Sequence, residues 1–218
     1  MIKRILEFFV KPTITYGITV NNEKEEITKL LDTLIALIDK NDEILVLQDV
    51  TNEDVDVTNI LKSYGNKILR ITARLNGDFA TFKNNLIKNS SKKYLFQIDA
   101  DELPKESLIK NIKLYIAGNL KSDCFLIPRI NIVNGIENEH VERWNWKVNQ
   151  DNYINYPDYQ TRLFKLNKGI KWQNKVHEAL VNFSKTKVLP SENYDFCLLH
   201  IKQIEKQERQ NDFYDTLS

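Results

Sequence analysis

The regular alternation of strand-like and helix-like segments in the first half of the chain most constrains its fold. Four short runs rich in apolar and β-branched residues are predicted as strands, at residues 13–20, 43–47, 67–72 and 94–98. Amphipathic segments typical of helices follow them, at residues 27–38, 55–64, 79–88 and 104–115. Strand–helix units of this length build a mostly parallel sheet with helices on its faces. The sequence therefore predicts an α/β fold with a Rossmann-like sheet.

Capping residues indicate where these helices begin and end. Asn22 is predicted as the N-cap of the first helix, with Glu25 as its partner in a capping box. Gly65 would supply the left-handed position after the second helix. Pro104 is predicted in the first turn of the fourth helix, which Gly118 would close.

The second half of the chain has a different pattern. Residues 124–132 and 160–166 are strand-like, and the segment between them is rich in Trp, Asn and Tyr. Residues 205–217 are predicted as a polar closing helix. This half contains no run of strand–helix units, so we expect it to be a mixed α+β region.

Composition agrees with one unit that has no strong charge bias. The hydrophobic share of 42% is ample for a core, and there is no internal repeat or clear linker. We expect a single domain over residues 1–218, with one half at about 13–118 and the other at about 119–218. The net charge of +1 gives no overall field that would attract nucleic acid, so no nucleic-acid partner is expected.

Cysteine usage and hydrophobic runs indicate a cytoplasmic protein. Cys124 and Cys197 both lie in apolar stretches, which predicts buried thiols in a reducing compartment. The apolar run near the start is too short for a signal peptide or a transmembrane helix, and Glu7 interrupts it. No later stretch reaches about 18 apolar residues.

Polar residues follow three of the predicted strands where each strand ends, namely Asn21-Asn22, Gln48-Asp49 and Asp99-Ala100-Asp101. Ligands of parallel α/β sheets bind beyond the carboxyl ends of the strands. Asp99 and Asp101 are two positions apart, so both carboxylates can face one site once the chain leaves the sheet. Mg²⁺ and Mn²⁺ prefer such oxygen ligands and often share them with substrate phosphates. The alternative is an acidic turn that caps the next helix.

Five segments form an ordered set over most of the chain: 18–23 (Ile-Thr-Val-Asn-Asn-Glu), 43–49, 77–84 (Gly-Asp-Phe-Ala-Thr-Phe-Lys-Asn), 94–102 (ending Ile-Asp-Ala-Asp-Glu), and Arg162-Leu163-Phe164 with Trp172 and Val176-His177-Glu178. Together they resemble the motifs of inverting family 2 glycosyltransferases with the GT-A fold, especially small bacterial lipopolysaccharide-core transferases. The resemblance implies a metal-dependent transfer of a sugar from a nucleoside-diphosphate sugar to a hydroxyl group. The first half would bind the donor nucleotide and the second half the acceptor.

The resemblance also implies which residues bind the donor: Thr19, Val20, Asn21, Asp49, Lys83 and Asp99. Lys83 would face the diphosphate where the family has Arg, and Lys is a point charge that cannot bind bidentately. Gln48 stands in place of a family Asp, and Val50 in place of a Gly. The nucleoside of the donor therefore stays open between uridine and guanosine.

A divalent cation, Mn²⁺ or Mg²⁺, is implied by the same resemblance. Asp101 would ligate the metal directly, while Asp99 would contact the ribose and the water around the metal. His200 is predicted to end a strand at residues 196–199, and its position resembles that of a late metal-binding histidine of GT-A enzymes. A neutral imidazole there would complete the metal site.

An inverting transfer needs a general base for the acceptor hydroxyl group. Glu178 is the predicted base, and Asp158 is the next in line. His177 would orient Glu178 or line the diphosphate, unless it is a packed core residue. Arg162 and Trp172 belong to the same motif block and are predicted to support the site.

Aromatic residues predict where the acceptor binds, because their faces pack on sugar rings. They are Trp144, Trp146, Tyr153, Tyr156 and Trp172, although each could equally be an anchor of the core or of a loop. His140 is predicted as a solvated loop residue, and the cations Lys202, Lys206 and Arg209 as a solvated helix face.

Two other functions compete with sugar transfer. A nucleotidyltransferase would carry a glycine-rich phosphate loop after its first strand, and Asn21-Asn22-Glu23 is no such loop. A catalytically inactive module that binds nucleotide sugars or glycans remains the second alternative. The expected partners are a UDP- or GDP-linked sugar and a glycan or other acceptor with a hydroxyl group.

Overall fold

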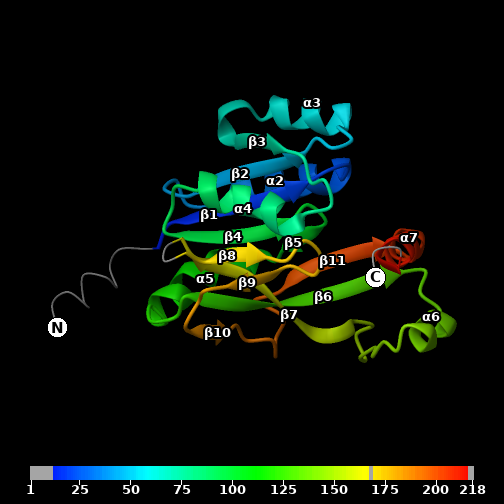
Figure 1. Ribbon diagram of the computed structural model, residues 1–218. Coiled ribbons are helices and arrows are strands. Elements are labelled where there is room, and N and C mark those ends of the chain that lie inside the picture. The colour runs from blue at the N-terminus through cyan, green and yellow to red at the C-terminus, as the bar shows by residue number, and fades with distance from the viewer. Residues whose placement is uncertain (1–11, 167–168, 216–218) are drawn as a thin grey trace.

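The computed structural model describes residues 12–166 and 169–215 (Figure 1). Expectations for residues 1–11 and for the end of the closing helix at residues 216–217 lie outside this part of the chain. The strands are β1 (Ile14–Val20), β2 (Glu43–Asp49), β3 (Leu69–Ala73), β4 (Tyr94–Asp99), β5 (Glu102–Pro104), β6 (Cys124–Asn134), β7 (Ile154–Lys165), β8 (Lys171–Gln173), β9 (Ala179–Val181), β10 (Thr186–Val188) and β11 (Leu198–Gln203). The α-helices are α2 (Lys24–Leu37), α3 (Val55–Ser63), α4 (Phe79–Asn89), α5 (Glu106–Gly118), α6 (Asn138–Arg143) and α7 (Ile204–Asp215), and a short 3₁₀ helix covers Gly65–Lys67.

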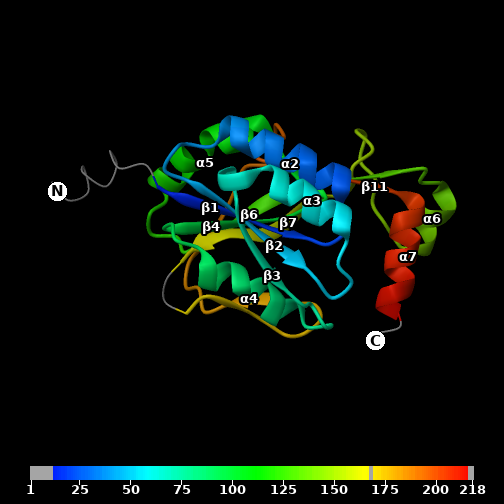
Figure 2. The same ribbon diagram turned by 90° about the horizontal axis from the view of Figure 1, so that it is seen from above.

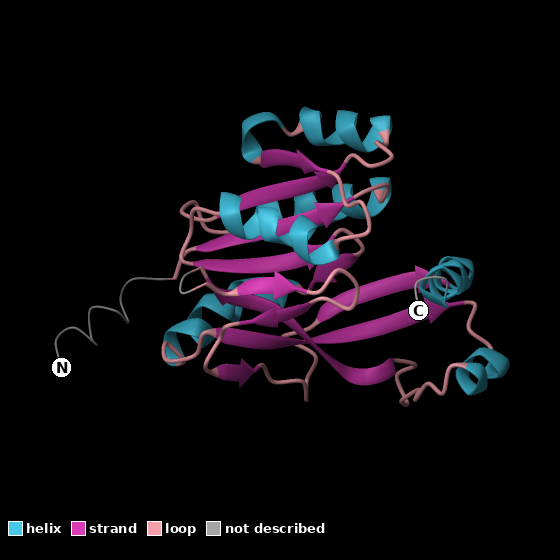
Figure 3. Ribbon diagram, in the orientation of Figure 1, coloured by secondary structure: helices cyan, strands magenta, loops and turns pink. Residues whose placement is uncertain are grey.

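One mixed sheet forms the centre of the described chain (Figure 3). Its strand order is β3-β2-β1-β4-β7-β6-β11-β5, with β10 also paired to β6. The first four of these strands are parallel to one another, as the strand–helix alternation predicts. Strand β7 is antiparallel to both β4 and β6 and joins the two halves of the sheet. The predicted α/β fold, parallel in its first half and mixed in its second, is confirmed.

Helices cover both faces of the sheet (Figure 2). Helices α2, α3 and α5 lie on one face, and α4 lies on the other together with the two-stranded β8–β9 sheet. The alternation of side chains along β1 explains these layers, because Ile14, Tyr16 and Ile18 all belong to the core beneath α2. Gly17 faces the α4 side, where an added Cβ atom would lie 2.6 Å from Leu95 and 3.4 Å from Leu86.

The long strand β6 explains how the second half reaches the carboxyl ends of the first-half strands. One edge of β6 pairs with β7, while the other pairs first with β10 and then, from Arg129 onward, with β11. Strand β11 pairs in turn with β5, which follows the Asp99-Ala100-Asp101 turn directly. Helix α7 continues from β11, and Lys206 in its first turn lies 3.4 Å from Asp101 of that acidic turn.

Two predicted helix starts are wrong. Helix α2 has Glu23 as its N-cap and no side-chain cap, because the Glu23 carboxylate instead accepts hydrogen bonds from the backbone N–H groups of Asn21 and Asn22. No capping box therefore forms between Asn22 and Glu25. Pro104 lies at the end of β5 and not inside α5, because β5 is held in the sheet by β11 up to Pro104.

Other local predictions hold in the structure. Gly65 has φ +56° directly after α3 and its C-cap, as expected for a left-handed position. Cys124 and Cys197 are buried free thiols. Within the described residues, no helix is long and apolar enough to cross a membrane.

We predict that Gly17→Ala lowers the free energy of unfolding by about 1–3 kcal/mol, because the new methyl group would press on Leu95 and Leu86 in a filled core. Urea denaturation measures this change. Gly118→Ala is the matched control, since nothing lies within 4 Å of the place that its new Cβ atom would take. Equal losses in the two variants would contradict close packing at Gly17.

Candidate functional site

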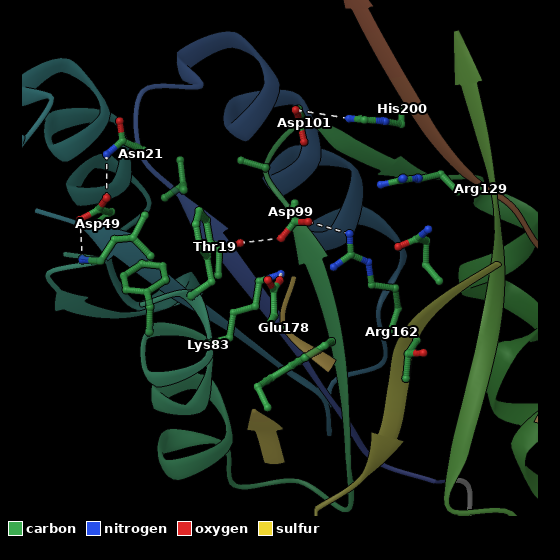
Figure 4. A pocket seen from close by; sticks show the side chains of 18 of the residues that line it. Thr19, Asn21, Asp49, Lys83, Asp99, Asp101, Arg129, Arg162, Glu178 and His200 are labelled. Atoms are coloured by element: carbon green, nitrogen blue, oxygen red, sulfur yellow. Dashed lines mark hydrogen bonds and ion pairs between the residues drawn. The ribbon is translucent and has the colours of Figure 1, made fainter. Parts of the chain in front are cut away.

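A cavity of about 680 Å³ opens at the carboxyl ends of β1, β2 and β4 (Figure 4). It collects residues that are far apart in the chain and that the sequence analysis singled out for donor binding, metal binding or catalysis. These are Thr19, Val20, Asn21, Asp49, Lys83, Asp99, Asp101, Arg162, Trp172, Glu178 and His200. The parallel strands explain the gathering, since their ends meet at one edge of the sheet.

Asp99 ends β4 and is held from two sides. Thr19 on the neighbouring strand donates its hydroxyl to Oδ1 at 2.8 Å, and Arg162 Nη2 donates to Oδ2 at 2.6 Å. Burial opposes ionisation of this carboxyl, but the charges of Arg162 and Lys83 outweigh burial. The pKa of Asp99 therefore lies well below its ordinary value. Its carboxylate is ionised and oriented before any ligand arrives.

Asp101 lies beyond the strand, opposite β11 and α7. Its Oδ2 atom is 3.5 Å from His200 Nε2 and 3.4 Å from Lys206 Nζ. Burial alone would raise the pKa of Asp101, but the hydrogen bond and charge of His200 outweigh it and hold the pKa well below the ordinary value. Lys202 contributes to the same effect, and burial lowers the pKa of its own ammonium group.

His200 reaches Asp101 because of strand pairing. It lies inside β11, where it is paired with Glu102 of β5, and not at the end of a strand as predicted. Its Nδ1 atom is 2.9 Å from Asn131 Oδ1. When Nδ1 carries the only proton and donates it to this amide oxygen, Nε2 no longer donates to Asp101 and instead presents a lone pair on that side.

Asp49 and Asn21 form the far side of the cavity from Asp101 (Figure 4). Asp49 Oδ1 accepts hydrogen bonds from the backbone N–H of Thr51 and of Leu75, at 2.8 and 3.1 Å. Asn21 Nδ2 donates to Asp49 Oδ2 at 3.2 Å. Asp49 thus ties the loops after β2 and β3 to the end of β1, and it also faces the cavity.

Gln48 lies outside this cavity. Its side chain is fully buried, donates to Thr58 Oγ1 at 2.8 Å and accepts from Arg70. The replacement of a family Asp by Gln48 therefore changes the packing between α3 and β3 and leaves the cavity wall unaltered.

Lys83 and Glu178 form an ion pair inside the cavity. Lys83 comes from α4, Glu178 from the loop before β9, and both side chains are largely buried. The Lys83 ammonium lies 5.1 Å from the centre of the Trp172 ring. Trp172 is itself fixed by hydrogen bonds of its indole to Gln97 and of its backbone to Asn84, both at 2.9 Å.

Two residues that the sequence analysis missed complete a buried charge network. Glu102 Oε1 accepts from Arg162 Nη2 at 2.6 Å and from Arg129 Nη1 at 2.9 Å. Arg129 also donates twice to Asp158 Oδ2, at 2.7 and 2.9 Å. The available signals were the position of Glu102 next to Asp101 and the lone cation within the apolar strand at 124–132, since a buried charge requires a partner.

His177 does not line the cavity. Its side chain is exposed and its backbone has φ +53°, so it is not a packed core residue. At this turn the His177 side chain is exposed, while the Glu178 side chain lines the cavity. An orienting role for His177 toward Glu178 remains a prediction.

The aromatic residues of the second half separate into two groups. Tyr153, Tyr156 and Tyr194 pack against one another, and the Tyr156 hydroxyl donates to the backbone of Ser191 at 2.5 Å. Trp144 is the C-cap of α6 and Trp146 lies just beyond it, where it lines a smaller cavity beside the first. The tyrosine group therefore anchors loops.

His140 is a helix residue and not a solvated loop residue. It lies in α6, where its Nδ1 accepts the Glu137 N–H in a capping box, and its ring stacks on Trp144. Its Nε2 atom is 3.6 Å from Glu208 Oε1 of α7.

A known protein family and several relatives match most of the chain. The model of the glycosyl transferase family 2 matches residues 16–184. The SPbeta prophage-derived glycosyltransferase SunS of Bacillus subtilis (strain 168) is 29% identical over 175 residues, as is glycosyltransferase SunS of Bacillus phage SPbeta. These matches cover 79% of this chain and 36% of each relative, so the chain spans little more than a third of their length.

Solved structures agree with the fold. The crystal structure of S. aureus TarS superimposes with a TM-score of 0.60 at 16% identity, covering 87% of this chain and 36% of TarS. TarS 1–349 in complex with UDP-GlcNAc gives a TM-score of 0.59 at 17% identity, with 87% and 58% covered. At these identities the likeness concerns the fold, and it agrees with the predicted GT-A type.

We predict that Arg162→Met lowers the free energy of unfolding by about 3–5 kcal/mol at neutral pH, because Asp99 and Glu102 lose their shared buried partner. Urea denaturation measures the loss, and the exposed Arg74→Met is the control, with an expected change within about 0.5 kcal/mol. A loss no larger than that of the control would contradict the role of Arg162.

The wild type and Arg162→Met also test the pKa of Asp99. A folded-state pKa below the unfolded value stabilises the fold above about pH 4, and this contribution is lost as the pH falls toward the folded-state pKa. We therefore expect stability to decrease below about pH 4 in the wild type, and less steeply in Arg162→Met.

Proposed function

The chain belongs to glycosyl transferase family 2, and we propose that it transfers a sugar from a nucleoside-diphosphate sugar to an acceptor hydroxyl group, with inversion at the anomeric carbon. One observation carries the proposal. The acidic pair Asp99 and Asp101 shares a single cavity with Asp49 and Lys83, at the carboxyl ends of parallel strands. Such an edge suits a nucleotide, and the volume of the cavity lies within the range of small-molecule sites.

The donor would lie along the strand ends. The base and ribose would occupy the side formed by Asn21 and Asp49, and the ribose would also meet Asp99. Lys83 would face the diphosphate as a single positive charge. A UDP-linked sugar is the first donor to test, because TarS, which shares the fold, has been solved in complexes with UDP-GlcNAc and with UDP.

The side chains around Asp101 could serve as ligands of a divalent cation that completes its coordination with substrate oxygens. Within the described residues no group of three or more His, Cys, Asp or Glu side chains converges on one point. Asp101 and His200 nevertheless face each other at 3.5 Å, and the contact of His200 with Asn131 is the outer contact typical of a metal-binding histidine. Mg²⁺ commonly takes only one or two protein ligands plus phosphates.

A bound Mn²⁺ or Mg²⁺ would neutralise the diphosphate and stabilise the charge on the departing nucleoside diphosphate. Asp101 and His200 would hold it. Lys206 also faces Asp101, so its ammonium group is available to the same diphosphate. This chain would then surround the leaving group with cations from α4 and from α7.

The transfer forms one bond and breaks another. The acceptor oxygen attacks the anomeric carbon as the bond between that carbon and the diphosphate oxygen breaks, and the bonding electron pair leaves with the nucleoside diphosphate. Glu178 would take the proton of the acceptor hydroxyl. Its position supports this role, because Glu178 shares the cavity with Lys83, and under this proposal Lys83 would face the diphosphate close to the anomeric carbon.

Asp158 is the weaker alternative for the base. Its Oδ2 accepts from Arg129 and Asn131, and its Oδ1 accepts from Gln160 at 2.6 Å. Burial opposes ionisation, but Arg129 and these hydrogen bonds outweigh it and lower the pKa of Asp158. A carboxylate with a lowered pKa and several donors accepts a proton less readily.

We predict that the protein releases nucleoside diphosphate from at least one nucleotide sugar when Mn²⁺ is present, measured with a panel of uridine and guanosine donors. Asp101→Asn should abolish the metal-dependent part of donor binding in calorimetry, because it removes a ligand charge. No release from any donor, with and without acceptors, would refute the transfer proposal. Donor binding without release would instead favour an inactive binding module.

We predict that Glu178→Gln reduces sugar transfer by about 10²–10⁴-fold while UDP binding is retained, because the amide cannot accept the proton. Steady-state kinetics and calorimetry measure the two effects separately. Asp158→Asn is the comparison variant. A large loss in Asp158→Asn together with full turnover in Glu178→Gln would assign the base to Asp158.

A further inference from the structure

A second cavity of about 310 Å³ adjoins the first. Strands β6, β7 and β11 form its floor, and α7 and the loop after α6 form its walls. Both cavities are lined by Arg129, His200 and Lys202. A ligand in the second cavity would therefore lie next to one in the first. Its volume is near the lower end for small-molecule sites.

The charges of this second cavity largely compensate one another. Arg129 contacts both Glu102 and Asp158, and His200 faces Asp101. Lys202 is buried and interacts with the charge of Asp101. A phosphate or carboxylate ligand would find Arg129 already engaged by two carboxylates. The charge pattern thus favours a neutral ligand.

Amide side chains supply most of the remaining polar lining. Asn131 and Asn155 come from the strand side, and Gln207 and Asn211 come from α7. Part of their capacity is already used, since Asn131 contacts Asp158 and His200, Asn155 Oδ1 accepts from the Lys147 N–H, and Gln207 donates to Asn211 Oδ1. The remaining Nδ2 groups of Asn155 and Asn211 and the Oε1 atom of Gln207 can pair with hydroxyl groups, which both donate and accept. A ligand that carries several hydroxyl groups suits this lining.

Trp146 provides a flat aromatic surface in the cavity, whose other apolar lining residues are Ile132, Val133 and Ile154. Two contacts hold Trp146 in position. The ring centre lies 4.7 Å from that of Trp144, and its backbone N–H donates to Val141 O at 2.9 Å. The contact between His140 and Glu208 joins α6 to α7, so the two walls of the cavity are connected.

We propose that this second cavity is the acceptor site and that it binds a neutral pyranose, with one face of the sugar ring on Trp146 and its hydroxyl groups on the amides. The proposal rests on the transfer function proposed above and specifies its acceptor as a glycan. An anionic polyol phosphate fits the compensated charges less well, and a peptide offers fewer hydroxyl groups to four amide side chains.

The test uses the full chain saturated with UDP and Mg²⁺, and saturation-transfer difference NMR with methyl glycosides of glucose, galactose and N-acetylglucosamine. Glycerol 3-phosphate and a serine-containing tripeptide are the comparison probes. We expect at least one glycoside to bind. Trp146→Ala should weaken it by about tenfold or more, and Trp146→Phe should restore part of the affinity. Asn211→Ala should weaken it about three- to tenfold.

Arg209→Ala is the matched control on α7, because Arg209 is exposed and lines neither cavity; it should leave binding unchanged. UDP affinity, measured in every variant, reports on the donor site independently. Glycoside binding that is insensitive to Trp146→Ala, binding of the comparison probes alone, or no glycoside binding while UDP binds would each overturn the acceptor proposal. Failure of both UDP and GDP to bind would instead count against the transfer function itself.

Discussion

The site depends on the Arg162 guanidinium, which pairs with two carboxylates at once. One of its nitrogen atoms lies 2.6 Å from Asp99 and 2.6 Å from Glu102, and both carboxylates are at the end of β4 or just after it. Without this cation the acidic turn would place negative charges next to each other in a buried setting, at a cost of several kcal/mol. Strand β7 carries Arg162 and is also the strand that joins the two halves of the sheet. Arg162 therefore links the acidic turn of the site to the strand that joins the two halves of the sheet.

The network continues from Arg162 through Glu102 and Arg129 to Asp158. It runs from the first cavity to the second, so the donor side and the proposed acceptor side share one set of ion pairs. The short strand β5 carries Glu102 of this network, and its pairing with β11 also brings His200 beside Asp101. A buried network of this kind holds its side chains in place before a substrate binds.

Local sequence signals failed where another contact decided the position of the residue. Asn22 has the right type for a helix cap, but Glu23 binds the backbone of this turn instead. Pro104 has the right type for a first helical turn, but β11 extends the sheet up to that residue. Gln48 departs from the family motif, yet it faces Thr58 and Arg70 and not the cavity. Each outcome was decided by a contact distant from the signal, except at Glu23.

The sequence by itself determined the strand–helix order, the edge of the sheet at which polar residues gather, and most of the cavity-lining residues, because hydrophobic periodicity and motif order are local properties. Only the tertiary structure decided which charges meet. Glu102 and Arg129 gained their place through contacts between β5, β6 and β7, and Glu178 met Lys83 from 95 positions away in the chain. Pairings over such separations depend on strand register and on how α4 and the β8–β9 sheet pack, and no local pattern encodes them.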